Sequence, residues 1–284
     1  MTRQHTIASP ASVTGVGIHT GKPATLTIRP AAENTGVVFV RTDVGGEAAA
    51  IPALATRVTT TELGTNMTND AGVSVATVEH FLAACAGLGV DNVVAELDGP
   101  ELPILDGSSG PFVDLLERAG AEVQTASRRV LRLLKPVEVR QGVKFARLSP
   151  AGGFTLNVAI DFPSKAIGRQ EISFTMTPGA FARDVAWART FGFARQAEQL
   201  HAMGKALGAS MENTVVIEDD AVINPGGLKA KDEFVRHKLL DVIGDLFLAG
   251  GVIEGRYDAE QPGHALNNQL LRAVFADETA FSWA

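Results

Sequence analysis

The chain has almost no cysteine and no long apolar run, and each absence excludes a class of protein. Cys85 is the one cysteine among 284 residues, so no internal disulfide can form and nothing points to an oxidising compartment. The longest strongly apolar stretch, residues 246–253, is far shorter than the ~20 residues that cross a bilayer. No apolar segment follows the N-terminal residues to form a secretory signal. We therefore expect a cytoplasmic protein with no transmembrane segment.

An excess of basic residues is also missing. Lys and Arg number 25 against 32 Asp and Glu, which gives a formal net charge of −7. Because nucleic acids are bound by clustered Lys and Arg, no nucleic-acid partner is expected. The glycines at 15–17 and 45–46 lack the strand, helix and spacing of a dinucleotide fingerprint, and the sequence has no P-loop. A small phosphorylated ligand would still need only a local basic pocket.

Apolar residues make up 45% of the chain, which is enough for a sizeable core. Strand patterns followed by helix patterns occur twice and predict an α+β protein with two domains, residues 1–126 and 127–284. The polar stretch 124–129 marks the boundary, and residues 191–227 have the character of an insert in the second domain. The expected strands are 24–29, 37–41, 73–76, 92–97, 130–133, 137–139, 144–148, 154–160 and 213–218. The expected helices are one that Thr77 caps and Gly87 or Gly89 ends, then 111–120, 180–187, 232–249 and 265–276.

The segment HKLLDVIGD places a histidine and two aspartates on one face of an expected helix. Asp241 follows His237 by four residues and Asp245 follows it by eight, so the three side chains share a face. A histidine and a carboxylate four residues apart can chelate one divalent ion. A solvated surface pair would show the same spacing, but two acids on a helix this apolar would be costly if they were buried without partners.

Glu79 and His80 stand at the start of another apolar helix. Adjacent helical residues diverge by about 100°, so both can border one pocket, one as a metal ligand and the other as a base. The alternative is a capping acid beside a core histidine. His264 follows a glycine at a third helix start, which leaves the imidazole accessible. Together His80, His237 and Asp241 would offer two imidazoles and a carboxylate, with Glu79 and His264 as base and acid for amide hydrolysis.

Long motifs in a fixed order carry a resemblance over nearly the whole chain. They are TGVGIHTG, TVEHFLAACAGLGVDN, LPILDGSSGPF, ARTFGF, DEFVRHKLLDVIGDLF and GHALNN. With these motifs the chain resembles the UDP-3-O-acyl-N-acetylglucosamine deacetylases, the zinc amidases of lipid A biosynthesis in Gram-negative bacteria. The resemblance implies two similar domains, each a β-sheet layered with helices, that face one another across the active site. It also implies an acylated UDP-sugar as substrate, and we expect a monomer.

The resemblance assigns roles to named residues. It implies that His80, His237 and Asp241 bind Zn²⁺. Glu79 becomes the general base and His264 the general acid, which Asp245 orients. Thr190 of the RTFGF motif would support the oxyanion.

Further assignments concern the substrate. Lys238 would lie at the substrate pocket, and Phe191 and Phe193 would contact the sugar or the acyl chain. Gln261-Pro262 replaces the Lys-Ser that precedes Gly-His in some members, so Lys144 is the candidate contact for the diphosphate. We further expect Leu200, Met203 and Leu207, at helical spacing in the insert, to line a passage for the acyl chain.

Two other functions share part of this pattern. An iron oxygenase with two histidines and one carboxylate usually holds them on barrel strands with a short His-x-Asp spacing, whereas these ligands are expected on helices. A metal-stabilised protein that only binds a sugar nucleotide would not need both Glu79 and His264 beside the metal.

Overall fold

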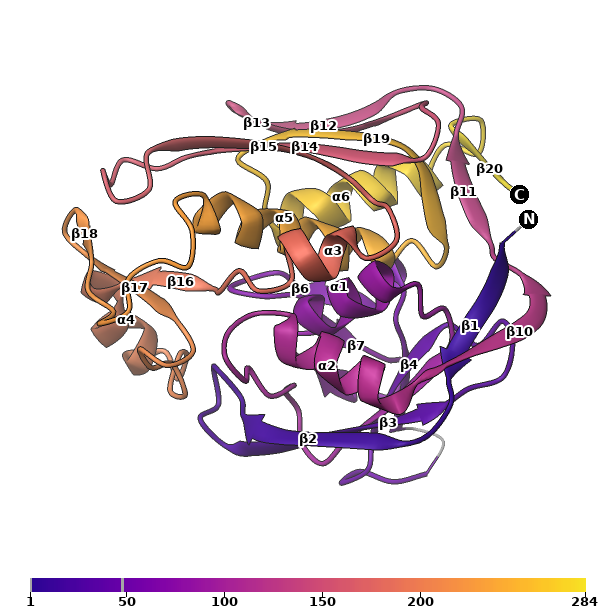
Figure 1. Ribbon diagram of the computed structural model, residues 1–284, viewed down its shortest axis with the longest axis horizontal. Helices are drawn as coiled ribbons and strands as arrows, with labels where there is room; N and C mark the ends of the chain where they lie inside the picture. Colours follow the sequence, from indigo (N-terminus) through magenta and orange to yellow (C-terminus); the bar gives the residue numbers. More distant parts are fainter. Residues whose placement is uncertain (1, 47–48) are drawn as a thin grey trace.

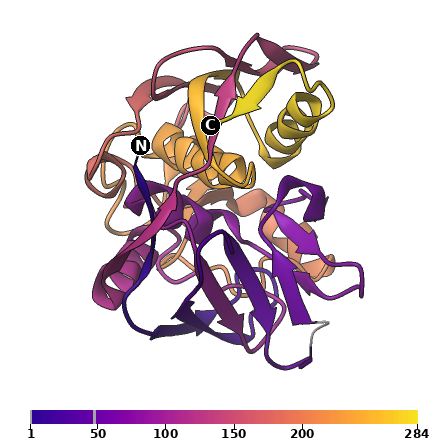
Figure 2. The ribbon, with the colours of Figure 1, turned by 90° about the vertical axis from the view of Figure 1, so that its right-hand side faces the viewer.

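The computed structural model describes residues 2–46 and 49–284. It contains two main β-sheets with helices between them, one sheet at the bottom and the other at the top of Figure 1. In the view of Figure 2 the earlier part of the chain forms the lower half of the molecule, and the later part, apart from the insert, forms the upper half. Both termini lie on the facing side. The expected α+β class is confirmed.

The first main sheet has five strands in the order β2-β3-β9-β4-β5. They are β2 (Ala11–Val16), β3 (Pro23–Pro30), β9 (Val93–Leu97), β4 (Val37–Arg41) and β5 (Ala50–Pro52). Buried side chains alternate along β3, β4 and β9, so one face of this sheet covers the core. Two smaller sheets accompany it. They are the pair β1 (Arg3–Ile7) with β10 (Ala121–Ser127), and β6 (Val58–Thr60), β7 (Asn66–Thr68) and β8 (Ser74–Val75).

The second main sheet has seven strands and is organised around β19 (Val252–Glu260). This strand pairs antiparallel with β13 and parallel with both β11 and β14. The other members are β11 (Val130–Leu133), β12 (Val137–Gln141), β13 (Lys144–Ser149), β14 (Phe154–Asp161), β15 (Arg169–Thr175) and β20 (Phe281–Trp283). Among the described residues, the strands up to β10 and the strands from β11 onward form separate sheets.

Helices α1 (Glu79–Leu88) and α5 (Glu233–Phe247) pack against each other between the two main sheets. Every residue of α1 from Glu79 to Cys85 is buried, because the helix is covered on all sides. Of the other helices, α2 (Gly110–Ala119) and α3 (Ala180–Asp184) pack against α1, and α6 (His264–Phe275) packs against α5. A short 3-10 turn at Ala55–Arg57 contacts α6. Helix α4 (Ala197–Ala202) and the 3-10 turn at Ala194–Gln196 belong to the insert. None of the helices in residues 2–46 and 49–284 is long and apolar enough to cross a membrane.

The expected start of α1 is wrong in one respect. Thr77 does not cap the helix: it has a φ of 59°, and its hydroxyl donates to Glu101 at 3.3 Å. Val78 occupies the cap position without a side-chain hydrogen bond. The expected end is confirmed at Gly89, whose φ of 71° is left-handed and costs glycine little.

The insert contains a small sheet of β16 (Phe191–Phe193), β17 (Val215–Glu218) and β18 (Ala221–Val222), with α4 beside it at the left of Figure 1. The expected helical stripe of Leu200, Met203 and Leu207 is wrong, because α4 ends at Ala202. The following loop instead contacts the first half of the chain, where the backbone N–H of Leu207 donates to the carbonyl of His19 at 3.2 Å.

Gly244 allows the close contact between α1 and α5. A methyl group at this position would lie 2.0 Å from the carbonyl oxygen of Glu79. Gly244→Ala should therefore destabilise the fold by about 2 kcal/mol or more, although alanine is the better helix former. Denaturant unfolding measures the effect. Gly226→Ala is the matched control, since its methyl group meets nothing within 4 Å. Equal stability of both variants would contradict a tight α1–α5 contact.

Candidate active site and metal centre

Three side chains that the sequence analysis singled out converge between α1 and α5. His80 lies in the first turn of α1, and His237 and Asp241 lie one turn apart on α5. All three are buried, and their possible ligand atoms lie within 4.8 Å of one another. Asp241 Oδ1 is 3.6 Å from His80 Nε2 and 3.4 Å from His237 Nε2. Tetrahedral zinc with bonds near 2.0–2.1 Å separates neighbouring ligand atoms by about 3.4 Å, so these residues could hold the ion.

The hydrogen bonds of this group leave the inward atoms free. His237 Nδ1 lies 3.0 Å from the carbonyl oxygen of Ala188, which fixes Nδ1 as the protonated nitrogen and leaves Nε2 with its lone pair. Burial lowers the pKa of His237 to about 3, so its imidazole is neutral. Asp241 Oδ1, which faces Nε2 of both histidines, is buried without a hydrogen-bond partner in the described part of the chain. The other ring nitrogen of His80, Nδ1, is also buried without a partner there. An unpartnered buried carboxylate oxygen between two imidazoles is what a cation would satisfy.

Lys238 supplies a positive charge next to this group. Its Nζ donates to Asp241 Oδ2 at 2.7 Å. Burial disfavours the charged form of both side chains, but their mutual attraction outweighs it. The pKa of Asp241 therefore falls well below its usual range and that of Lys238 rises. Both groups are charged at neutral pH.

A second cluster lies beside the first and joins α1, α5 and α6. His264 Nδ1 is 2.9 Å from Asp245 Oδ2, and His264 Nε2 is 3.8 Å from Glu79 Oε1. Burial disfavours the imidazolium, yet the charges of Asp245 and Glu79 raise the pKa of His264 to about 10. Burial raises the pKa of Glu79. The site thus places the Glu79 carboxyl group beside the His264 imidazole, and the pKa values of both are raised.

Three residues that the sequence analysis did not single out hold this second cluster in place. The hydroxyl of Thr65 donates to Asp245 Oδ1 at 2.5 Å, and its backbone N–H donates to Glu79 at 3.0 Å. Asn267 donates to Asp245 Oδ2 at 2.8 Å and accepts from the hydroxyl of Tyr257 at 2.7 Å. Asn267 lies within the GHALNN motif, but no sequence signal distinguishes Thr65, which is 180 residues from Asp245.

Thr190 and Phe191 lie close to the group formed by His80, His237 and Asp241, whereas Phe193 lies further along the insert. Thr190 lies two residues after Ala188, whose carbonyl contacts His237. The backbone of Thr190 is fixed because its N–H donates to Gly107 and its carbonyl accepts from Val215. The Phe191 ring is 6.2 Å from the His237 ring and 5.5 Å from Lys238 Nζ. Phe193 contacts the Phe162 ring at 6.3 Å and the guanidinium of Arg195 at 5.2 Å.

Lys144 lies on the second main sheet and not on the helices that carry His80, His237 and Asp241. It is exposed and begins β13 at the turn of the β12–β13 hairpin, opposite Gln141. The next residue, Phe145, pairs with Glu260. The ladder therefore places Lys144 next to the segment at Gln261 that leads to His264.

Glu233 anchors the insert to the start of α5, a role that no sequence signal indicated. Its carboxylate is fully buried and accepts from Arg189 Nε at 2.8 Å and Nη2 at 3.1 Å. It also accepts from the backbone N–H of Lys229 at 2.6 Å, and Arg189 donates to the carbonyl of Gly227. One carboxylate thus ties both ends of the insert to the helix that carries His237.

Comparison with known proteins agrees with this geometry. A family model described as UDP-3-O-acyl N-acetylglycosamine deacetylase matches residues 4–276. The UDP-3-O-acyl-N-acetylglucosamine deacetylase of Phenylobacterium zucineum is 51% identical over 278 residues, which are 98% of this chain and 95% of that protein. The enzyme of the same name from Shewanella oneidensis is 49% identical over 280 residues, 98% of this chain and 91% of that protein. With matches over nearly its whole length and this site between its helices, the chain belongs to the UDP-3-O-acyl N-acetylglycosamine deacetylase family.

Proposed function

We propose that this protein is a zinc-dependent amide hydrolase. Its reaction removes the N-acetyl group of UDP-3-O-(3-hydroxyacyl)-N-acetylglucosamine and releases acetate, the committed step of lipid A biosynthesis. The observation that carries the proposal is the buried set His80, His237 and Asp241 beside the Glu79–His264 pair. Membership of the family supplies the substrate class.

The three ligands set where the reaction takes place. His80, His237 and Asp241 would hold Zn²⁺, which when bound lowers the pKa of water and polarises the acetamide carbonyl. Glu79, the neighbour of His80, takes the proton of the attacking water as general base. Because its pKa is raised by burial, Glu79 is a stronger base than an exposed carboxylate. The backbone N–H of Thr65 fixes the carboxylate for this transfer.

His264 completes the reaction as general acid. An amine is a poor leaving group until it is protonated, so a separate proton donor is required. The contact with Asp245 keeps the imidazole charged at neutral pH and fixes its orientation. Because Thr65 and Asn267 hold Asp245 in turn, the acid is positioned before substrate binds.

The substrate contacts follow from the same layout. The hydroxyl of Thr190 would stabilise the oxyanion, and Lys238 would meet the sugar or its phosphates beside Phe191. Lys144 would reach the diphosphate from the hairpin next to Gln261. Half-exposed apolar residues of the insert, among them Met203 and Leu207, would shelter the acyl chain together with Phe193.

The proposal also covers where the protein works and what it does not need. We assign it to the cytoplasm as a monomer, acting on a nucleotide-linked lipid precursor without a nucleic-acid partner. The position of the ligands on two helices separates it from the oxygenases considered above. Since Glu79 and His264 lie together beside the ligands, a protein that only binds the sugar nucleotide is disfavoured.

The ligand assignment predicts the metal content of variants. His237→Ala should lower bound zinc well below one ion per chain, because two ligands hold the ion far less well than three. Elemental analysis of the purified protein measures this. His201→Ala changes an exposed histidine of the insert and should leave the zinc content unchanged. Full zinc in the His237 variant would refute the ligand set.

The division of labour predicts a loss of turnover without loss of metal. Glu79→Ala and His264→Ala should each retain zinc and lower kcat by roughly 10²-fold or more, the usual contribution of a general base or acid. Acetate release from the acylated UDP-sugar measures kcat. A variant with near-normal kcat would remove its residue from the mechanism, and an inactive wild-type enzyme would refute the proposed substrate.

The Asp245–His264 contact predicts a shift in pH dependence. His264 must be protonated to act, and the charge of Asp245 helps to raise its pKa to about 10. Asp245→Asn should lower that pKa and move the alkaline limb of kcat/KM to lower pH. The acid limb, where Glu79 must ionise, should move in the same direction, because, besides burial, the charge of Asp245 also raises the pKa of Glu79. Asp114→Asn changes an exposed acid of α2 and is the control. An alkaline limb unmoved by Asp245→Asn would show that His264 is not the acid.

A further inference from the structure

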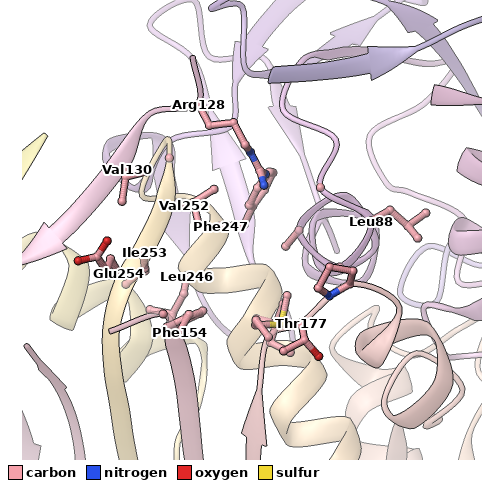
Figure 3. Close-up of a pocket in the computed structure, with 18 of the residues that line it drawn as sticks. Leu88, Arg128, Val130, Phe154, Thr177, Leu246, Phe247, Val252, Ile253 and Glu254 are labelled. Carbon is pink, nitrogen blue, oxygen red and sulfur yellow. The ribbon is translucent and has the colours of Figure 1, made fainter. Parts of the chain in front are cut away.

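A cavity of about 520 Å³ lies at the far ends of α1 and α5 from the catalytic residues. Its wall comes from both halves of the chain, with Leu88 on α1, Phe154 on β14, Leu246 and Phe247 on α5, and Val252 and Ile253 on β19. Figure 3 shows these side chains gathered around the space between the strands and the two helices. The volume falls within the range of sites that bind small molecules.

This cavity is separate from the metal-ligating group. Glu79 and His80 begin α1, whereas Leu88 ends it, and the nine steps of 1.5 Å from Glu79 to Leu88 put these ends about 13.5 Å apart. On α5, Ile243, Leu246 and Phe247 form one face by their i, i+3, i+4 spacing. Asp241 is two residues before Ile243 and points to the other side of the helix. None of the proposed catalytic or zinc-binding residues lines the cavity.

One cation stands at the mouth of this apolar space. Arg128 lies directly after β10, and Figure 3 shows its side chain extending toward Phe247. Its Nε donates to Asp91 Oδ1 at 2.8 Å, and Asp91 Oδ2 is held by the backbone N–H of His5 at 2.9 Å. Within residues 2–46 and 49–284, neither Nη of Arg128 donates a hydrogen bond. The guanidinium is thus fixed through Nε, and its two Nη atoms are available to a ligand.

The charges around Arg128 restrict what it can bind. Asp91 already neutralises part of its charge, so a ligand with one negative charge suits it better than a dianion. Glu254 also lines the cavity, but its carboxylate pairs with Arg132 at 2.7 Å on the exposed side. A planar guanidinium edge with two free N–H groups matches the two oxygens of a carboxylate.

We propose that this cavity is a binding site for an aliphatic carboxylate, with the hydrocarbon chain between α1, α5 and β19 and the carboxylate on Arg128. Each methylene taken from water contributes to affinity, and the single charge fixes the direction of the chain. The site lies on the seam between the two main sheets and takes wall residues from both sides. Its ligand therefore binds the assembled fold and not the unfolded chain, and it should raise Tm.

Decanoate is the probe for this site, and isothermal titration calorimetry is the measurement. Wild-type protein should bind decanoate, and Arg128→Gln should weaken the binding about tenfold or more because a charged hydrogen bond is lost. Arg118→Gln removes an exposed arginine of α2 and should bind like the wild type. 1-Decanol has the chain without the charge and should bind the wild type about as weakly as decanoate binds the Arg128 variant.

A second variant separates this cavity from the insert, where an acyl chain is also proposed to bind. Ala86 lines the cavity on α1, and Ala86→Leu should fill part of it and weaken decanoate binding. Leu207→Glu in the insert should leave the binding unchanged. Binding lost in the Leu207 variant but kept in the Ala86 and Arg128 variants would place decanoate in the insert and overturn the proposal. Equal affinity for decanoate and 1-decanol, or no binding by wild-type protein, would also overturn it, and neither result depends on a variant folding.

Discussion

The close contact of α1 with α5 is the constraint on which the rest of the site depends. Gly244 lies so near the backbone of Glu79 that no side chain fits between the helices. This contact brings the first turn of α1 against the middle of α5, where His237 and Asp241 point toward His80. His80, His237 and Asp241, the proposed ligands, come together from distant parts of the chain because the two buried helices approach closely at Gly244.

Burial is what gives the residues of the centre their chemistry. In water Glu79, His264 and Asp241 would titrate near their ordinary pKa values, but between two sheets each responds strongly to its neighbours. The same burial makes every unpaired charge costly. The structure meets that cost with short contacts from Thr65, Asn267 and Lys238 to the carboxylates. The hydrogen bonds that stabilise the fold here also orient Glu79, Asp241 and Asp245, which are proposed to take part in the reaction.

A buried carboxylate also fixes the insert relative to α5. Glu233 ties Arg189 and the backbone of Lys229 to the first turn of α5, so the two ends of residues 191–227 are fixed while the loop between them reaches the first half of the chain. At the opposite end of α5 the packing is less complete and leaves the apolar cavity beneath Arg128. The same helix therefore carries the proposed catalytic ligands on one face and lines a second, chemically different space with another.

The sequence by itself determined the class of fold, the family and the helices that carry the site residues, because strong periodicity and long motifs depend only on local order. It did not predict β10 in the polar stretch 121–127, whose side chains are largely exposed. It did not predict β19 either, where small Gly255 and Ala259 alternate with Ile253 and Tyr257 at the buried positions and charged residues stand between them. Thr77 was misread because a threonine before a helix usually caps it, whereas here the hydroxyl bonds Glu101 from another segment. The support of Asp245 by Thr65, the anchor at Glu233 and the cavity under Arg128 were decided only by tertiary structure, since each joins residues whose proximity no local pattern encodes.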